Sequence, residues 1–298
     1  MISIVTGWGM KLGTGHVQRM AALAEFLSRN KNTECRIVGD RAPDFLPASI
    51  HRYFHSGIDT AGGWIIHDRR DSTVDDMTSL RRRGRVITID DCGEGRTTAD
   101  ASIDLLPNLK FNQQEKTSFI YGYNFIQSLR AAGKTGIHKN IDVAVYAGYD
   151  PAPETLRKLR SFIPERSTCA ILSGKDPVLL KNNTEKRLAR PYAEILAASK
   201  VLITHFGITL YEGSIAGCRL LTVNPTEYHS QLADKVRDDL GVINIGILDG
   251  ADRGRALEII SHGMNNPLAE IVYPGIMFEK TTAGLENLYS LLLIKMAR

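Results

Sequence analysis

The chain has 298 residues, of which 43% are hydrophobic and 23% are charged. This composition is typical of a globular protein, is long enough for two domains of ordinary size, and excludes a disordered or fibrous chain. The 37 Lys and Arg residues against 33 Asp and Glu give a net charge of +4, which suits an acidic substrate such as a phosphate ester without requiring nucleic acid.

Short apolar runs alternate with helical patterns along the whole chain. The first helical pattern places Val17, Met20, Ala21, Ala24 and Leu27 on one face. The apolar runs have four to six residues each and are almost continuously apolar, as expected for buried parallel strands, so the fold class is α/β with parallel sheets. The predicted strands are Ser3–Thr6, Cys35–Val38, Trp64–Ile66, Val86–Ile89, Ile103–Leu106, Val143–Ala147, Thr168–Leu172, Lys200–Thr204, Leu220–Val223 and Ile243–Ile247.

The strands form two series, and a polar, glycine-containing stretch separates them. We therefore predict an N-terminal domain over 1–130, a linker over 131–140 and a C-terminal domain over 141–298. A strongly apolar helix over Ala283–Met296 would pack back across the boundary. Ligands bind beyond the carboxyl ends of parallel strands, so two such domains predict a cleft between them.

Several sequence features exclude other classes of protein. The four cysteines lie far apart with no C-x-x-C pair, which predicts neither a metal site nor a disulfide framework. We expect no signal peptide and no integral membrane segment, and hence a cytoplasmic protein. The basic cluster of Arg81, Arg82, Arg83 and Arg85 is interpreted as a solvated helix end, with Gly84 turning the chain into the next strand.

The loop after the first strand is the first candidate for chemistry. "GWGMKLGTGHVQR" is not a phosphate-binding P-loop, and it lacks the third glycine of a dinucleotide fingerprint. Gly13, Thr14 and Gly15 let the backbone approach a ligand, and a helix begins near His16. That position disfavours an imidazolium, so His16 is a candidate general base, with Arg19 one turn further on the same face. The alternative is a glycine turn with a surface histidine.

The stretch Val201–Val223 is the second candidate. A strand ends at Thr204, and the backbone of Phe206, Gly207, Ile208 and Thr209 can hold a diphosphate at a helix N-terminus. Glu212 would bind ribose hydroxyls, because a carboxylate makes two good hydrogen bonds to a vicinal diol. The alternative role for Glu212 is a capping box with Thr209.

Two further strand ends carry candidate ligand contacts. Gly148 and Tyr149 follow the strand that ends near Ala147, and the following Asp150–Pro151 pair resembles a helix cap. His67 and Asp68 follow one strand and Asp90 and Asp91 the next, which can bring these side chains near the opening loop. They could orient His16, bind sugar hydroxyls, ligate a cation or only cap helices. Asp68 and Asp91 are the substrate-binding candidates of this set.

These motifs together resemble a known family. G-T-G-H-V-x-R-M near the N-terminus and T-x-Y-E-x-x-x-x-G in the second half are similar to the nucleotide-sugar hydrolases of pseudaminic acid biosynthesis. Those enzymes remove UDP from UDP-2,4-diacetamido-2,4,6-trideoxy-β-L-altropyranose. More distantly, both motifs resemble the glycosyltransferase-B enzyme that adds N-acetylglucosamine to the peptidoglycan lipid precursor. "VITIDD", "AGYDP" and Gln231 also correspond to family positions, so the resemblance covers most of the chain.

The resemblance implies two Rossmann-like domains of glycosyltransferase-B type, with UDP in the C-terminal one and no cofactor. It implies that His16 activates water to attack the anomeric carbon with inversion, and that Gln231 contributes to the nucleotide site. The chain departs from the family at Arg70, where a tyrosine is usual, in "AGYDP", which replaces a glycine and a serine, and at the bulky His205, Phe206 and Ile208. These positions would surround the sugar and the phosphates.

Three functions remain open at this point. The first is an inverting nucleotide-sugar hydrolase, whose partner is a small-molecule nucleotide sugar rather than nucleic acid; the sequence identifies no protein partner. The second is a small inverting glycosyltransferase in which a hydroxyl replaces water. The third is a non-catalytic nucleotide-sugar-binding protein. An NAD-dependent enzyme is a weaker choice, since Asp40 follows the second strand but the glycine pattern is broken.

Overall fold

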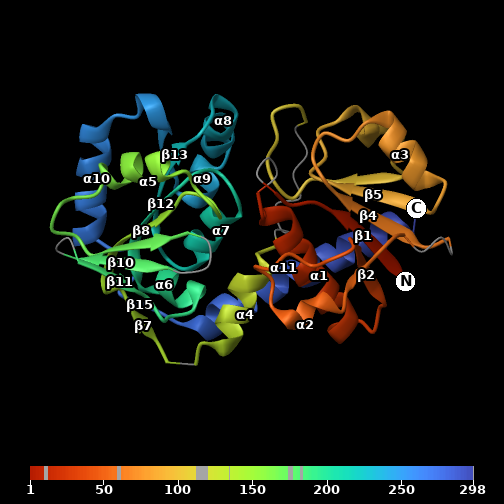
Figure 1. Ribbon diagram of the computed structural model, residues 1–298, viewed down its shortest axis with the longest axis horizontal. Helices are drawn as coiled ribbons and strands as arrows, with labels where there is room; N and C mark the ends of the chain where they lie inside the picture. Colours follow the sequence, from red (N-terminus) through yellow and green to blue (C-terminus); the bar gives the residue numbers. More distant parts are fainter. Residues whose placement is uncertain are drawn as a thin grey trace. The chain divides into compact units, whose positions relative to one another are not determined.

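The computed structural model describes residues 1–9, 13–58, 62–111, 120–133, 135–173, 177–181 and 184–297. The chain divides into two compact units. Unit 1 comprises Met1–Asn124 and Thr281–Arg298, and unit 2 comprises Phe125–Lys280. Each unit is built around its own sheet (Figure 1).

Unit 1 contains a six-stranded sheet in the order β3-β2-β1-β4-β5-β6, and all of its strand pairs are parallel. Its strands are β1 (Ile2–Thr6), β2 (Cys35–Val38), β3 (Phe54–His55), β4 (Trp64–Asp68), β5 (Arg85–Ile89) and β6 (Ala101–Ile103). Its helices are α1 (Gly15–Asn30), α2 (Ala48–His51), α3 (Val74–Arg81) and the 3₁₀ helix η1 (Glu94–Thr98). The strand order reverses between β1 and β4, which is where ligands bind in sheets of this type.

The helix α1 buries the face that the sequence predicts. Val17, Met20, Ala21, Ala24 and Leu27 are all fully buried, and the helix packs on β1 and β2. This packing fixes the rotation of α1 about its axis, and with it the direction of the side chains in the first turn.

Unit 2 contains a seven-stranded sheet in the order β11-β10-β9-β8-β12-β13-β14. Its strands are β8 (Ile141–Tyr146), β9 (Cys169–Leu172), β10 (Val178–Lys181), β11 (Thr184–Arg187), β12 (Ser199–Thr204), β13 (Arg219–Asn224) and β14 (Ile243–Ile247). Its helices are α5 (Pro153–Arg160), α6 (Tyr192–Ala198), α7 (Ile208–Ile215), α8 (Glu227–Lys235), α9 (Arg237–Leu240), η2 (Leu248–Gly250) and α10 (Arg253–Asn265). The order reverses between β8 and β12.

The five strands from β9 to β14 are parallel, and their central members are buried on both faces. Val143, Val145, Ile203 and Leu221 form one continuous core with the helices around them. This is the packing that the near-continuous apolar runs predict, and the α/β fold class with parallel sheets is confirmed.

Four parts of the strand prediction are wrong. The two-residue edge strand β3 (Phe54–His55) was missed. The strand predicted over Ile103–Leu106 ends at Ile103, because the next backbone N–H groups bind a side chain, as described below. The hairpin β10–β11 is antiparallel and was missed, since β11 is exposed throughout and has no apolar run. A short antiparallel pair, β7 (Ile137–His138) with β15 (Ile271–Val272), was also missed, and β7 lies within the predicted linker.

The chain passes from one unit to the other within two helices, α4 (Tyr123–Ala131) and α11 (Pro274–Met296). The helix predicted over Ala283–Met296 is confirmed, and α11 begins earlier, at Pro274. In the part of the chain that the structure describes, no helix has both the length and the apolar character that a membrane span requires.

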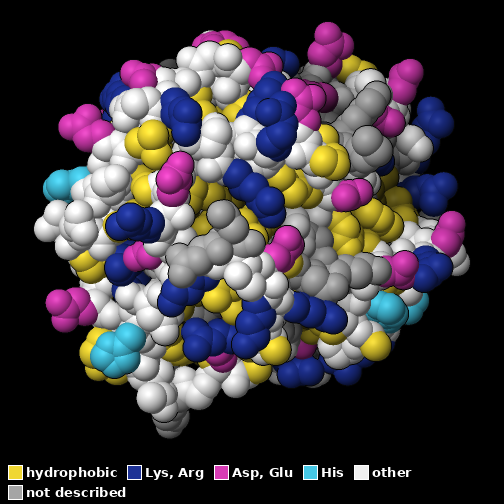
Figure 2. Space-filling model, turned by 60° about the vertical axis from the view of Figure 1, so that its left-hand side comes forward, with side chains coloured by type: hydrophobic (Ala, Val, Ile, Leu, Met, Phe, Trp, Pro, Cys, Tyr) yellow, Lys and Arg dark blue, Asp and Glu magenta, His cyan; other side chains and the backbone are white. Residues whose placement is uncertain are grey.

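The basic cluster is confirmed as a solvated helix end. Helix α3 ends at Arg81, and Arg81, Arg82, Arg83 and Arg85 are exposed. Arg81 binds Asp100 at 2.9 Å, and Arg85 lies over the Trp64 ring. Lys and Arg side chains are spread over the face drawn in Figure 2 with Asp and Glu side chains between them, in keeping with the small net charge.

Candidate functional site

The point in unit 1 where the strand order reverses carries the predicted base. His16 is the second residue of α1, which follows β1, and Asp68 is the last residue of β4. Thr6 at the end of β1 pairs with Asp68, so both chain segments leave the sheet side by side. His16 Nδ1 lies 2.8 Å from Asp68 Oδ1. The structure therefore brings together two residues that are 52 positions apart in the chain.

The contact with Asp68 fixes the tautomer of His16. An ionised carboxylate only accepts hydrogen bonds, so the proton lies on Nδ1 and the lone pair of the neutral ring lies on Nε2. Within the described residues, no hydrogen bond is recorded for Nε2. The His16 side chain is 11% exposed, whereas Asp68 is fully buried. The histidine is thus the group of this pair that solvent can reach.

Arg19 holds the same carboxylate from one turn further along α1. Its Nε donates to Asp68 Oδ2 at 2.8 Å, and its Nη2 donates to Asp68 Oδ1, the oxygen that also accepts from His16. Burial opposes ionisation of Asp68, but the charge of Arg19 and the hydrogen bonds from Arg19 and His16 outweigh it and hold the pKa of Asp68 well below its usual range. Burial likewise opposes the charge on Arg19, whose pKa is nevertheless raised by Asp68 and Asp90.

Asp90 is the second carboxylate on Arg19. Its Oδ2 accepts from Arg19 Nη1 at 2.5 Å, and its Oδ1 accepts from the backbone N–H groups of Leu105 and Leu106 at 2.6 and 2.9 Å. Burial raises the pKa of Asp90 despite the neighbouring Arg19, because one guanidinium serves two buried acids. The guanidinium of Arg19, expected on a substrate, is 3% exposed and is occupied by these two carboxylates.

Asp91, another substrate-binding candidate, ties two loops together. Its Oδ1 accepts from the N–H groups of Ser72 and Gly93 at 3.0 and 2.9 Å, and its Oδ2 accepts from the Ser72 hydroxyl. Asp91 is fully buried. Its contacts belong to the segments before α3 and η1, but Asp91 caps neither helix, because α3 is capped by Thr73 and no side-chain cap is recorded for η1.

The glycine loop before His16 is held by backbone pairing. Gly9 and Gly13 exchange two backbone hydrogen bonds of 3.2 and 2.7 Å, and both have positive φ angles, of 131° and 68°. Thr14 precedes α1 without a side-chain cap, and Gly15 is the first helical residue. The loop residues 10–12 lie outside the described residues. The pairing brings the chain back on itself directly before His16, which requires glycine at these angles.

The corresponding point in unit 2 lies between β8 and β12. Gly148 and Tyr149 follow β8, and the turn before α7 follows β12. Gly148 has a φ of 107°, and a Cβ placed there would lie 3.9 Å from His205 Nε2. The structure thus brings Gly148 close to the predicted nucleotide-binding turn. His205 donates from Nδ1 to the Phe206 carbonyl at 2.9 Å, and burial lowers the pKa of His205, which favours a neutral ring.

The backbone of this turn is only partly available to a ligand. The Phe206 N–H donates to Asn224 Oδ1 at 2.9 Å. The N–H groups of Gly207, Ile208 and Thr209 precede that of Leu210, which donates to the Gly207 carbonyl at 3.1 Å, and no hydrogen bond from the three is recorded among the described residues. Three of the four predicted donors are therefore placed to meet an anion at the helix N-terminus.

Two capping predictions in unit 2 are wrong. Thr209 and Glu212 do not form a capping box, because α7 begins at Ile208 with Gly207 as its N-cap. Asp150 and Pro151 do not cap α5, which has Ala152 as its N-cap and Pro153 at its first position. In both cases the helix starts at a residue other than the one whose side chain suggested a cap.

Glu212 and Gln231 have partners within the protein. Tyr192 donates its hydroxyl to Glu212 Oε2 at 2.8 Å, and Glu212 is 3% exposed. Burial, with a further contribution from the Glu212 charge, raises the pKa of Tyr192 well above its usual value. Gln231 is exposed and donates to Glu227 Oε1 on the same helix at 3.0 Å.

Sequence reasoning missed the residues that support this turn. Asn224 Nδ2 donates to Asn244 Oδ1, and Asn244 in turn donates to the Ser230 carbonyl, so a pair of asparagines joins the turn to α8 and β14. Asn224 follows the strand-end pattern and could have been found by it. Tyr192 carries no comparable signal. Within the described residues, no three His, Cys, Asp or Glu side chains are arranged to hold a metal ion, and the four cysteines are free and buried.

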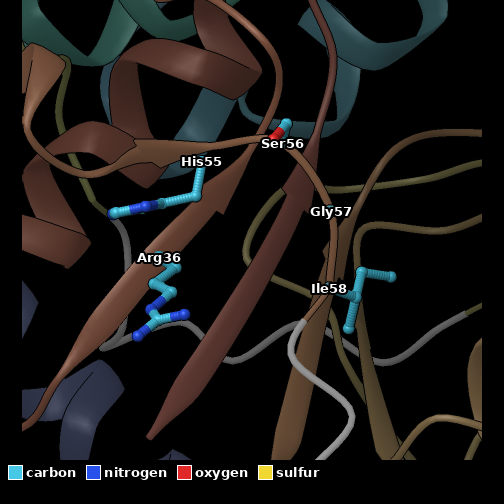
Figure 3. A pocket seen from close by; sticks show the side chains of 5 residues that line it. All are labelled: Arg36, His55, Ser56, Gly57 and Ile58. Atoms are coloured by element: carbon cyan, nitrogen blue, oxygen red, sulfur yellow. The ribbon is translucent and has the colours of Figure 1, made fainter.

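A separate pocket lies at the β2–β3 edge of the unit 1 sheet. It has a volume of about 260 Å³ and is lined by Arg36, His55, Ser56, Gly57 and Ile58 (Figure 3). Arg36 already donates twice to Glu34 Oε1, at 3.2 and 2.8 Å. None of the predicted site residues lines this pocket, so it is distinct from the His16 cluster.

The similarity of this chain to known proteins lies in its fold. No protein-family model matches the chain, and no curated protein matches its sequence. Solved structures do match: the spinosyn rhamnosyltransferase SpnG in complex with spinosyn aglycone has a TM-score of 0.60 at 12% identity, covering 97% of this chain and 99% of that one. The glycosyltransferase of kitacinnamycin has a TM-score of 0.57 at 10% identity, covering 99% and 98%.

A third similar structure is a protein from Listeria monocytogenes described as a UDP-N-acetylglucosamine 2-epimerase. It has a TM-score of 0.52 at 11% identity, covering 99% of this chain and 95% of that one. These similarities extend over nearly the whole chain in each case. The fold is of glycosyltransferase-B type, as the resemblance implied, whereas the hydrolase family itself is not shown.

Proposed function

We propose that this protein is an inverting glycosyltransferase that uses a nucleotide sugar as donor. The observation that carries the proposal is the His16–Asp68 pair at the β1–β4 reversal point, with Nδ1 bound to a buried carboxylate and Nε2 as the acceptor. A neutral imidazole held in this tautomer by a carboxylate is suited to remove a proton from a hydroxyl group. The solved glycosyltransferases of the same fold support this reading.

In the proposed reaction, the acceptor oxygen forms a bond to the anomeric carbon of the donor sugar. The bond from that carbon to the diphosphate oxygen breaks, and its electron pair leaves with the nucleoside diphosphate. The proton of the acceptor hydroxyl passes to His16 Nε2. Asp68 stabilises the imidazolium that results and keeps the ring in place.

Unit 2 would hold the leaving diphosphate. The N–H groups of Gly207, Ile208 and Thr209 and the positive end of the α7 dipole offer stabilisation to the negative charge that develops on the leaving group. His205, next to Gly148, lies within the same turn. The amide donors need no change in protonation during the reaction.

A second candidate is hydrolysis of the nucleotide sugar, with water in place of the acceptor. The observation that favours it is the motif G-T-G-H-V-x-R-M, which resembles the nucleotide-sugar hydrolases. The same base and the same leaving group serve both reactions. The two candidates therefore differ only in which oxygen attacks.

The test uses a panel of UDP-, GDP- and CMP-sugars and measures released nucleotide with and without hydroxyl acceptors such as N-acetylglucosamine, glucose and a phenol. Release that depends on an acceptor supports the transferase, and equal release in water alone favours the hydrolase. His16→Ala is the reference for background release. No release above that reference with any donor contradicts both candidates and leaves the binding-protein function.

A further inference from the structure

We propose that Arg19 and Asp90 are positioning residues that fix the Asp68–His16 pair and set the protonation of His16. The inference rests on the proposed function of His16 as a base and concerns how that base is prepared. It assigns Arg19 a role in holding Asp68 rather than in binding a substrate.

The contacts from His16 through Asp68 and Arg19 to Asp90 are continuous. His16 binds one oxygen of Asp68, Arg19 binds both oxygens of Asp68, and Asp90 binds the remaining end of Arg19. Asp90 itself is anchored by two backbone N–H groups beyond β6. The two carboxylates and the guanidinium are thus each held on both sides, and the series runs from the backbone of Leu105 and Leu106 to the His16 ring.

The whole series is largely shielded from solvent. The Asp68, Arg19 and Asp90 side chains are 0%, 3% and 8% exposed, and the His16 side chain is 11% exposed. Asp68, the carboxylate that binds His16, is the least exposed of the four. Fixed charges in such an environment act on His16 more strongly than exposed charges do, because solvent screens them less.

The net charge of the four groups depends on the protonation of His16. With a neutral His16, Asp68, Arg19 and Asp90 together carry a charge of −1, and protonation of His16 brings the four groups to zero. The series thus stabilises the imidazolium that forms in the proposed reaction. Arg19 alone would cancel the negative charge of Asp68. Asp90 adds a second negative charge and so keeps the net charge of the three groups at −1, although Asp90 does not touch the ring.

Asp90→Asn tests the charge. Asn keeps the size and one acceptor oxygen, but it removes the negative charge at Arg19. We expect the midpoint of the His16 titration to fall by about 0.5–1 pH unit, since a nearby buried charge has been lost. The readout is the long-range ¹H–¹⁵N correlation spectrum of the imidazole rings, in which the His16 signals are identified by their absence in His16→Ala.

Asp104→Asn is the matched control. Asp104 is 2% exposed and forms a two-bond ion pair with Arg96, at 2.6 and 2.7 Å, in the same segment as the N–H groups that anchor Asp90. We expect it to lower the melting temperature as much as Asp90→Asn does and to leave the His16 titration unchanged. A shift of equal size in both variants would show a general effect of loosening this segment and would overturn the inference.

Arg19→Lys tests the geometry separately from the charge. Lysine keeps the positive charge but cannot make the three fixed contacts of the guanidinium. We expect its His16 midpoint to move less than that of Asp90→Asn. With any donor that the wild-type protein consumes, we expect kcat to fall about 10-fold or more at an unchanged KM.

The spectra separate this inference from the proposed function, because they require no substrate. A wild-type His16 without the Nδ1–H tautomer, or an unchanged midpoint in Asp90→Asn, would overturn the inference even in an active enzyme. An absence of turnover with the donor panel would contradict the proposed function and leave the spectra to test the series of contacts by themselves.

Discussion

The two sheets reverse their strand order at equivalent places, but the groups at those places differ in kind. In unit 1, between β1 and β4, ionisable side chains from α1, β4 and the loop after β5 bind one another. In unit 2, between β8 and β12, neutral asparagines hold a turn at the start of α7, and no hydrogen bond is recorded among the described residues for the N–H groups of Gly207, Ile208 and Thr209. The carboxylate described there, Glu212, lies against Tyr192.

Ionisable side chains and backbone amides are suited to different parts of a group-transfer reaction. Side-chain charges are suited to proton transfer, because they gain or lose a proton and respond to their neighbours. Backbone N–H groups are suited to anion binding, because they donate without titrating. We therefore expect substitutions in unit 1 to act on the chemical step and substitutions in unit 2 to act on donor binding.

His16→Ala would have the largest effect. Loss of a general base costs about 10²–10⁴-fold in turnover, so we expect kcat to fall by this factor while KM for the donor changes little. Steady-state kinetics with an active donor measures both. His55→Ala, at an exposed histidine in the same unit, serves as the control and should behave like the wild type. If turnover survived in His16→Ala, His16 would not be the general base, and the assignment of proton transfer to unit 1 would be wrong.

Asn224→Ala would have the next largest effect, on KM rather than on kcat. It leaves the buried Phe206 N–H without its acceptor, at a cost of about 1–3 kcal/mol, and loosens the turn before α7. We expect KM for the donor to rise about 10-fold with kcat nearly unchanged, measured in the same assay. Asn266→Ala, at the exposed end of α10, is the control. A fall in kcat without a change in KM would show that unit 2 contributes to the chemical step.

The sequence predicts the sheets better than it predicts the contacts at their edges. Buried strands are almost continuously apolar, and β5 and β12 are found within one residue of where the pattern places them, because their burial leaves little choice of residue. The hairpin β10–β11 has no such constraint and was missed. The end of β6 was wrong because a side chain, Asp90, takes the N–H groups of Leu105 and Leu106 that a strand would use.

At the site, the sequence predicts which side chains lie at the strand ends, but it does not predict which of them bind one another. The strand-end pattern indicates His16, Asp68 and Asp90, but the pairing depends on the rotation of α1 and on the sheet order. Helix starts fail for a similar reason: a Thr or Asp near a helix suggests a cap, but packing sets the first residue of α7 and α5. The role of Arg19 follows only from the two carboxylates around it.

The smallest effect concerns a histidine that lies next to Asp68 in sequence and has no part in the series of contacts. His67 is 4% exposed, and its Nδ1 has no hydrogen-bond partner among the described residues. Burial lowers the pKa of His67 from its usual value of 6.5. The unfolded chain therefore takes up a proton below about pH 6.5 that the folded chain resists, so the contribution of His67 to stability is present above that pH and is lost as the pH falls toward its folded pKa.

His67→Leu removes both the unpaired nitrogen and the titration. We expect a gain in the free energy of unfolding of up to about 1 kcal/mol at pH 7.5, a larger gain at pH 5, and unchanged kinetics with an active donor. Urea unfolding at the two pH values measures this, with His55→Leu as the exposed control. If His67→Leu instead altered kcat, His67 would take part in the reaction, and the catalytic residues of unit 1 would include one on the other side of β4. If the pH dependence were unchanged, protonation elsewhere, for example at the buried His205 of unit 2, would account for the acid sensitivity.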